Sequence, residues 1–105
     1  MIRLATWRPR IETAPNEAAL LALMNEYCSI WLPSDLARLP IACQQCFPAA
    51  IDDIPFMAVT LKQEDLMFVG DEESRRLLHE LAGVFGIAAE RLRSLRSPWR
   101  SLESS

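Results

Sequence analysis

The chain has 105 residues, a hydrophobic share of 50% and a formal net charge of -3. This length fits a single domain, residues 1–105, which can bury a core without disulfides or metal. The negative charge argues against a general nucleic-acid coat. The longest apolar-rich run, Ala18–Leu32, is too short to span a bilayer. Because the N-terminus has no apolar signal core, we expect a cytoplasmic protein without a membrane segment.

The N-terminal third predicts a short strand and then a long buried helix. Residues Ile2–Trp7 place apolar side chains on alternate positions, and Pro9 is expected to end this strand. Thr13 or Asn16 can cap a helix that runs to about Leu32. Polar residues are rare along this helix, so we expect it to lie at the centre of the fold.

The middle of the chain predicts short helices and a β-hairpin. Pro33 is expected to end the long helix, Ser34 and Asp35 to start a short one that Pro40 closes, and Pro40 to begin another helix of a single turn. Phe56–Leu61 and Leu66–Val69 are expected to pair as strands around the polar turn 62–65. The first of these strands is apolar almost throughout, which indicates that both of its faces are covered.

The C-terminal part predicts two helices and a frayed tail. Asp71 follows a turn glycine and can cap a helix, and Gly86 is a suitable residue to end it. A second, arginine-rich helix is expected over Ala88–Arg96, with residues 98–105 as the tail. Together with the strand and the hairpin, this order predicts a small α+β domain.

Residues Leu78–Ser97 carry small or apolar residues at spacings that suit two crossed helices separated by Gly86. This pattern resembles the helix-turn-helix of bacterial transcription regulators and of the promoter-reading domain of sigma factors. The resemblance implies that the arginine-rich helix enters the DNA major groove, where Arg91, Arg93 and Arg96 would contact guanine edges and phosphates. Two alanines replace the polar pair that usually starts such a helix. The alternative is a pair of packed helices that displays its arginines to solvent.

The spacing of Cys43 and Cys46 is that of a metal half-site or of a dithiol centre. With Cys28 and His79 these residues would supply a complete Cys3His zinc site. A second closely spaced pair of ligands is absent, so we expect the cysteines to be reduced and to pack as small hydrophobes. His79 falls on the polar face of its helix without a neighbouring nucleophile, and the sequence predicts no catalytic residue and no cofactor.

We therefore expect a non-enzymatic interaction or regulatory module. The high apolar content predicts self-association, most simply as a homodimer, and a further protein partner is compatible with this expectation. The first alternative is a DNA-binding regulator that uses residues 78–97. The second is a module stabilised by metal at the two closely spaced cysteines.

Overall fold

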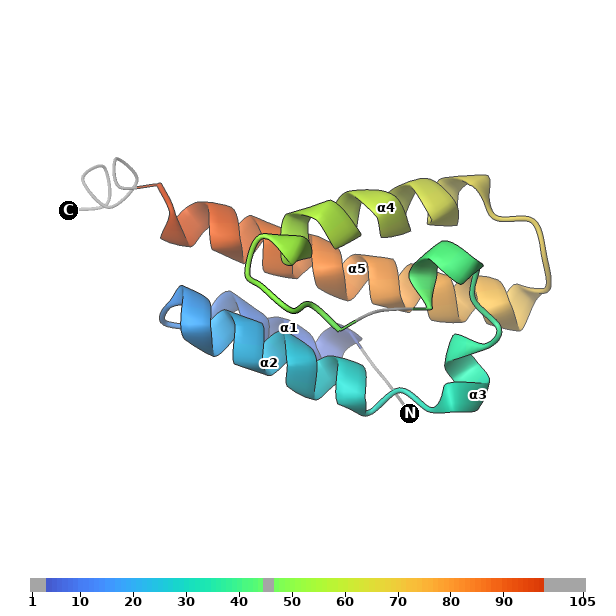
Figure 1. Cartoon of the computed structure of the whole chain (residues 1–105), viewed down its shortest axis with the longest axis horizontal. Coiled ribbons are helices and arrows are strands. Elements are labelled where there is room, and N and C mark those ends of the chain that lie inside the picture. Colours follow the sequence, from blue (N-terminus) through green and yellow to red (C-terminus); the bar gives the residue numbers. More distant parts are fainter. Residues whose placement is uncertain (1–3, 45–46, 98–105) are drawn as a thin grey trace.

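In the computed structural model, which describes residues 4–44 and 47–97, every regular element is a helix. The longest helix lies between an N-terminal helical hairpin on one side and a single antiparallel helix on the other (Figure 1). The elements in chain order are α1 (Leu4–Glu12), α2 (Glu17–Ser29), α3 (Pro33–Leu36), the 3₁₀ helix η1 (Ile41–Cys43), α4 (Asp53–Met67) and α5 (Glu72–Leu95).

Helix α5 organises the core because one apolar stripe runs along most of its length. The stripe residues recur every three or four positions, which places them on one helix face. They pack against α1, α2 and α4, so each of the other long helices is positioned by α5. The buried residues of the stripe are Leu78, Leu81, Val84, Phe85, Ala88 and Leu92.

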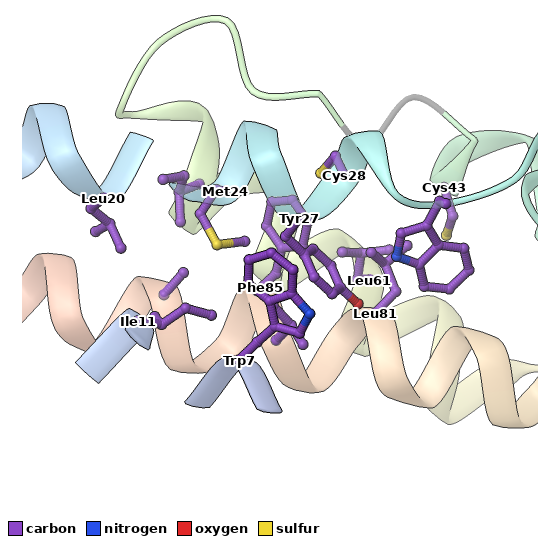
Figure 2. Packing of buried hydrophobic residues seen from close by; sticks show 14 of the residues in the cluster. Trp7, Ile11, Leu20, Met24, Tyr27, Cys28, Cys43, Leu61, Leu81 and Phe85 are labelled. Carbon is purple, nitrogen blue, oxygen red and sulfur yellow. The ribbon is translucent and has the colours of Figure 1, made fainter. Parts of the chain in front are cut away.

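Aromatic side chains join α1 to α2 at the other side of the core. The rings of Trp7 and Tyr27 meet edge to face with centroids 5.3 Å apart, and those of Tyr27 and Trp31 do so at 6.4 Å. Figure 2 shows Trp7, Tyr27, Phe85 and Leu61 converging from four different helices. This mixed packing makes the helices mutually dependent, since each one buries its apolar face only against the others.

The predicted N-terminal strand is wrong, because residues from Leu4 onward form helix α1. Trp7, Ile11 and Ala14 are buried and recur at helical spacing. Pro9 lies inside this helix and does not end it. The alternation over Ile2–Trp7 was too short to distinguish a strand from the first turns of an amphipathic helix.

The predicted β-hairpin is also wrong, and with it the α+β class. Residues 53–67 form one continuous helix, and no strand occurs in the described part of the chain. Ile54 and Leu61 point into the core from this helix, whereas Phe56 and Val59 are exposed. The apolar run therefore reflects a helix with apolar residues on two faces, which gives no clear helical period in the sequence.

The two predicted C-terminal helices are one helix. Helix α5 continues through Gly86, and no described glycine has a positive φ angle. The segments before and after Gly86 share the same buried stripe, so packing favours an unbroken helix over a turn. The predicted tail, residues 98–105, lies outside the described residues.

Several helix starts predicted from the sequence are confirmed. The Asn16 side chain accepts a hydrogen bond from the Ala19 amide at 2.8 Å, and Asp71 accepts one from the Ser74 amide at 2.8 Å. Helix α2 ends near the expected position, and short helices follow Pro33 and Pro40. These helix starts could therefore be predicted from the sequence, because a cap depends on residues only three positions apart.

Alanine substitutions at two leucines of α4 test its orientation. Leu61 is 2% exposed, so Leu61→Ala should lower the free energy of unfolding by about 2–5 kcal/mol. Leu66 is 77% exposed, so Leu66→Ala should change it by no more than about 0.5 kcal/mol. Denaturant unfolding at low protein concentration measures both values without a contribution from self-association. Equal losses would contradict the helical arrangement of residues 53–67.

Candidate interaction surface

The solvent side of α4 carries a row of large apolar side chains, which we call the outer face of α4. Phe56 is 74% exposed, Val59 60%, Leu66 77% and Met67 78%. Residues 56, 59, 63 and 66 follow the spacing i, i+3, i+7 and i+10, which is the seam pattern of paired helices. Gln63 is the polar member of this seam. In Figure 1 α5 lies along one side of α4, and the opposite side faces outward.

A groove of about 480 Å³ adjoins the outer face and is lined by residues of both α4 and α5, which pack together beneath it. Its walls on α4 include Val59 and Leu66, so the groove and the outer face form one continuous surface. Its floor on α5 is built from small residues, which keep the groove open. These floor residues are Ala82, Gly83, Gly86 and Ala89.

Gly86 has no structural explanation within its own chain. An interior helical glycine costs about 1 kcal/mol relative to alanine. At Gly70 an added Cβ would lie 2.6 Å from the Phe68 ring, so that side chain would have to shift. At Gly86 an added Cβ would meet nothing within 4 Å, and the backbone has no positive φ. The fold therefore tolerates a destabilising residue where alanine would fit.

Each end of the groove carries an acid and a base. At one end His79 Nδ1 lies 2.9 Å from Asp65 Oδ2, and at the other Arg93 Nη1 donates to Glu90 Oε1 at 2.7 Å. The groove is thus charged, with both signs, at its ends, and Lys62 adds a positive charge to an otherwise apolar middle. The His79 side chain is 78% exposed, as expected for a surface histidine.

Two of the three arginines assigned to DNA contact hold the fold together. Arg91 donates through Nε and Nη2 to the Ala14 carbonyl at 3.0 and 2.8 Å, which fixes the turn between α1 and α2 against α5. Arg96 binds Glu17 at 2.9 Å and Asp52 at 2.7 Å. Glu17 is the first residue of α2 and Asp52 directly precedes α4, so Arg96 links α5 to both of these helices.

The turn expected at Gly86 is absent, so Leu78–Leu95 does not form two crossed helices. Arg93 projects from the exposed side of α5, where it pairs with Glu90. The guanidinium groups of Arg91 and Arg96 would have to release their protein partners before they could contact a phosphate. DNA binding by these residues stays a prediction from the sequence.

The cysteines of the predicted metal set lie in different environments. Cys28 is buried on α2, Cys43 is buried on η1, and Cys46 lies outside the described residues. Within residues 4–44 and 47–97, no group of three or more His, Cys, Asp or Glu side chains is placed to hold a metal ion. His79 is turned toward Asp65 at the groove. Burial raises the pKa of the Cys43 thiol to about 11, which disfavours the thiolate that a metal requires.

Comparison with known proteins gives no relative: no family model, no curated protein and no solved structure matches the chain. In the described part of the chain, no helix combines the length and the apolar character needed to cross a membrane.

Sequence reasoning missed the outer face of α4 and the groove beside it. The signal was present, since the apolar run over Phe56–Leu61 indicated cover on two faces. The strand interpretation assigned that cover to neighbours within the fold. The helical interpretation gives one face to the core and leaves the other exposed.

The contact between Glu17 and Arg96 predicts an acid-dependent loss of stability. The hydrogen bond from Arg96 lowers the pKa of Glu17 below its ordinary value of 4.5. The stabilisation is therefore present above the unfolded pKa and is lost as pH falls through the lower folded pKa. Glu17→Gln should lower Tm at pH 7 by a few degrees, and this difference should vanish near about pH 3.

Thermal melts monitored by circular dichroism between these pH values measure the difference. Glu12→Gln is the matched control, because Glu12 contacts Arg8 only at 3.8 Å across one exposed helix turn. Such surface pairs contribute about 0.5 kcal/mol or less. A constant Tm difference for Glu17→Gln across the pH range would show that Arg96 does not stabilise the carboxylate.

The buried cysteines predict slow thiol chemistry. In a Cys46→Ser variant, Cys28 and Cys43 should react with a thiol reagent at least about a hundredfold more slowly than a free thiol at pH 8. Both should react at once in guanidinium, which serves as the control. We also expect a chelator to leave the melting curve unchanged. Stoichiometric zinc in the purified full-length protein, or unfolding by the chelator, would instead favour the metal-stabilised module.

Proposed function

We propose that this protein is a non-enzymatic interaction module that self-associates through the outer face of α4 and the adjoining α4–α5 groove. The observation that carries the proposal is the exposed seam on α4, in which large apolar residues recur at the spacing of paired helices. The occupant of this surface is a second copy of the same chain. Two-fold dimers are the commonest oligomers of soluble proteins.

The magnitudes support a reversible dimer. Complete burial of a large apolar side chain stabilises by about 1.5–3 kcal/mol. At their observed exposed fractions, the four apolar residues of the outer face contribute roughly 9–17 kcal/mol over two copies. Association costs about 4–15 kcal/mol in lost freedom. The two ranges overlap, which is the condition for a reversible dimer, and we propose a dissociation constant in the micromolar range.

The chemistry of the surface supports binding over catalysis. His79 and Asp65 form an oriented pair at the groove, but the groove lining contains no hydroxyl or thiol that such a pair could activate. The remainder of the lining is mainly small or aliphatic. We place the protein in the cytoplasm, where the thiols of Cys28 and Cys43 would stay reduced.

A charge placed on the seam should separate the two copies. Leu66→Glu is expected to weaken self-association at least about a hundredfold, because a lone carboxylate would be buried at the interface. Sedimentation equilibrium and light scattering over a concentration series measure the mass. The fold should persist, since Leu66 is exposed in the single chain.

Leu32→Glu is the matched control, because Leu32 is 60% exposed but lies between α2 and α3, away from the seam. This variant should associate like the wild type. A wild-type mass near 11.9 kDa up to high micromolar concentration would overturn the proposed function. Equal weakening by both variants would move the interface away from α4.

A further inference from the structure

We infer that Gln63 lies at the two-fold axis of the dimer, where it forms two reciprocal amide hydrogen bonds with the partner's Gln63. This inference rests on the proposed self-association through the outer face of α4. It adds the residue at the axis and the polar contact that fixes the register of the interface. The feature that points to it is one uncharged polar side chain at the centre of an exposed apolar surface.

Gln63 lies at the centre of the outer face of α4. At about 100° per helical residue, Phe56 and Met67 lie within about 40° of Gln63 on one side of the helix. Val59 and Leu66 lie within about 60° of it on the other side. Each of these four apolar side chains is 60% exposed or more. A surface that covers all four must therefore also cover Gln63.

The outer face is bounded by a hollow on each side, so α4 forms a ridge between them. One hollow is the α4–α5 groove, which Val59 and Leu66 line. The other is a cavity of about 270 Å³ between η1 and α4, which Phe56 and Phe47 line. Because exposed apolar side chains lie on both sides of the ridge, a contact centred on either hollow would leave part of them in water. A contact centred on the ridge covers both sets.

The Gln63 amide is available to bond to a partner. Its side chain is exposed, and within the described residues it makes no hydrogen bond to another residue. Burial of an amide without a hydrogen bond is unfavourable, so a dimer that covers Gln63 has to supply a donor and an acceptor. A second primary amide supplies both. Each NH2 group donates to the carbonyl of the other, and this pair of bonds has two-fold symmetry.

The polar neighbours of Gln63 on α4 are less suited to the axis. The Thr60 hydroxyl already donates to the Phe56 carbonyl at 3.1 Å. Lys62 lines the α4–α5 groove, and Glu64 lines a separate hollow at the far end of α4. The residue nearest a two-fold axis meets its own equivalent, so either of these charged residues would meet a like charge there. Gln63 meets its equivalent without repulsion.

The amide pair gives the interface its register. A shift of one helical turn would break the contact between the two amides and bury each of them against apolar side chains. A seam without a polar residue would tolerate such a shift. In paired helices a single polar residue in the seam specifies the register and the number of helices that associate, at a cost in affinity.

The contact is tested with two variants of the full chain, Gln63→Glu and Gln63→Lys. Both substituents favour helix and the position is exposed, so the fold should persist. Each variant alone should self-associate at least about tenfold more weakly than the wild type, because like charges would meet at the axis. An equimolar mixture should associate at least about tenfold more tightly than either variant alone, because opposite charges then meet. Sedimentation equilibrium measures all of these dissociation constants.

Ala22→Glu and Ala22→Lys are the matched control pair. Ala22 is exposed on α2, which lies on the other side of α5 from α4 (Figure 1). These two variants should associate like the wild type, both alone and when mixed. A general effect of added charge would instead change the association of both pairs and would overturn the contact at Gln63.

Gln63→Leu tests whether the amide pair sets the register. This substitution should tighten self-association at least about tenfold, because it removes the only polar residue of the seam. Masses above that of a dimer should also appear, since an apolar seam no longer limits how many helices pair. An unchanged dissociation constant together with an unchanged mass would overturn this role of the amide.

The mass of the wild type separates failure of this inference from failure of the proposed function. If the wild type is a dimer, a mixture of Gln63→Glu and Gln63→Lys that associates no more tightly than its components would overturn the contact between the two amides. The proposed function would then stand. A wild-type protein that stays monomeric would overturn both.

Discussion

The buried stripe of α5 is the constraint on which the rest of this structure depends. It presents one unbroken apolar surface from Leu78 to Leu92, and α1, α2 and α4 all bury their own apolar faces against it. A break at Gly86 would divide this surface and separate the helices that it joins. The long helix therefore persists through a residue that disfavours it, because packing outweighs a local cost of about 1 kcal/mol.

The same arrangement decides which polar groups are available for function. Arg91 and Arg96 lie at the C-terminal end of α5, where the α1–α2 turn and Asp52 come close enough to bind them. Arg91 and Arg96, which the helix-turn-helix resemblance assigns to DNA contact, therefore connect helices within the fold. The surface that we propose for a partner is on α4, where large apolar side chains are exposed.

The extent of agreement between sequence and structure follows the range of the interactions involved. The caps at Asn16 and Asp71 were predictable because a side chain and an amide three residues away form them. Strands were wrongly predicted at Ile2–Trp7 and Phe56–Leu61, where a short apolar run fits a strand and a helix equally well. Only contacts between distant segments, such as Trp7 with Tyr27, select the helix.

The candidate surface could likewise be predicted only in part, because it depends on both local and long-range interactions. That residues 56–61 need cover on two sides was evident from their composition. Which side the fold itself covers, and that Gly86 lies beside the exposed one, required the packing of α4 on α5.

By itself the sequence determined helix caps, a hydrophobic share of 50%, and three cysteines without a second closely spaced pair of ligands. These properties depend on residue type and on near neighbours. The tertiary structure alone decided that Gly86 continues a helix, that Arg91 and Arg96 bind their own chain, and that α4 presents an apolar seam to solvent. The reason is physical: burial and partner choice are set by residues far apart in the chain, and a periodic pattern does not specify which of its faces meets the core.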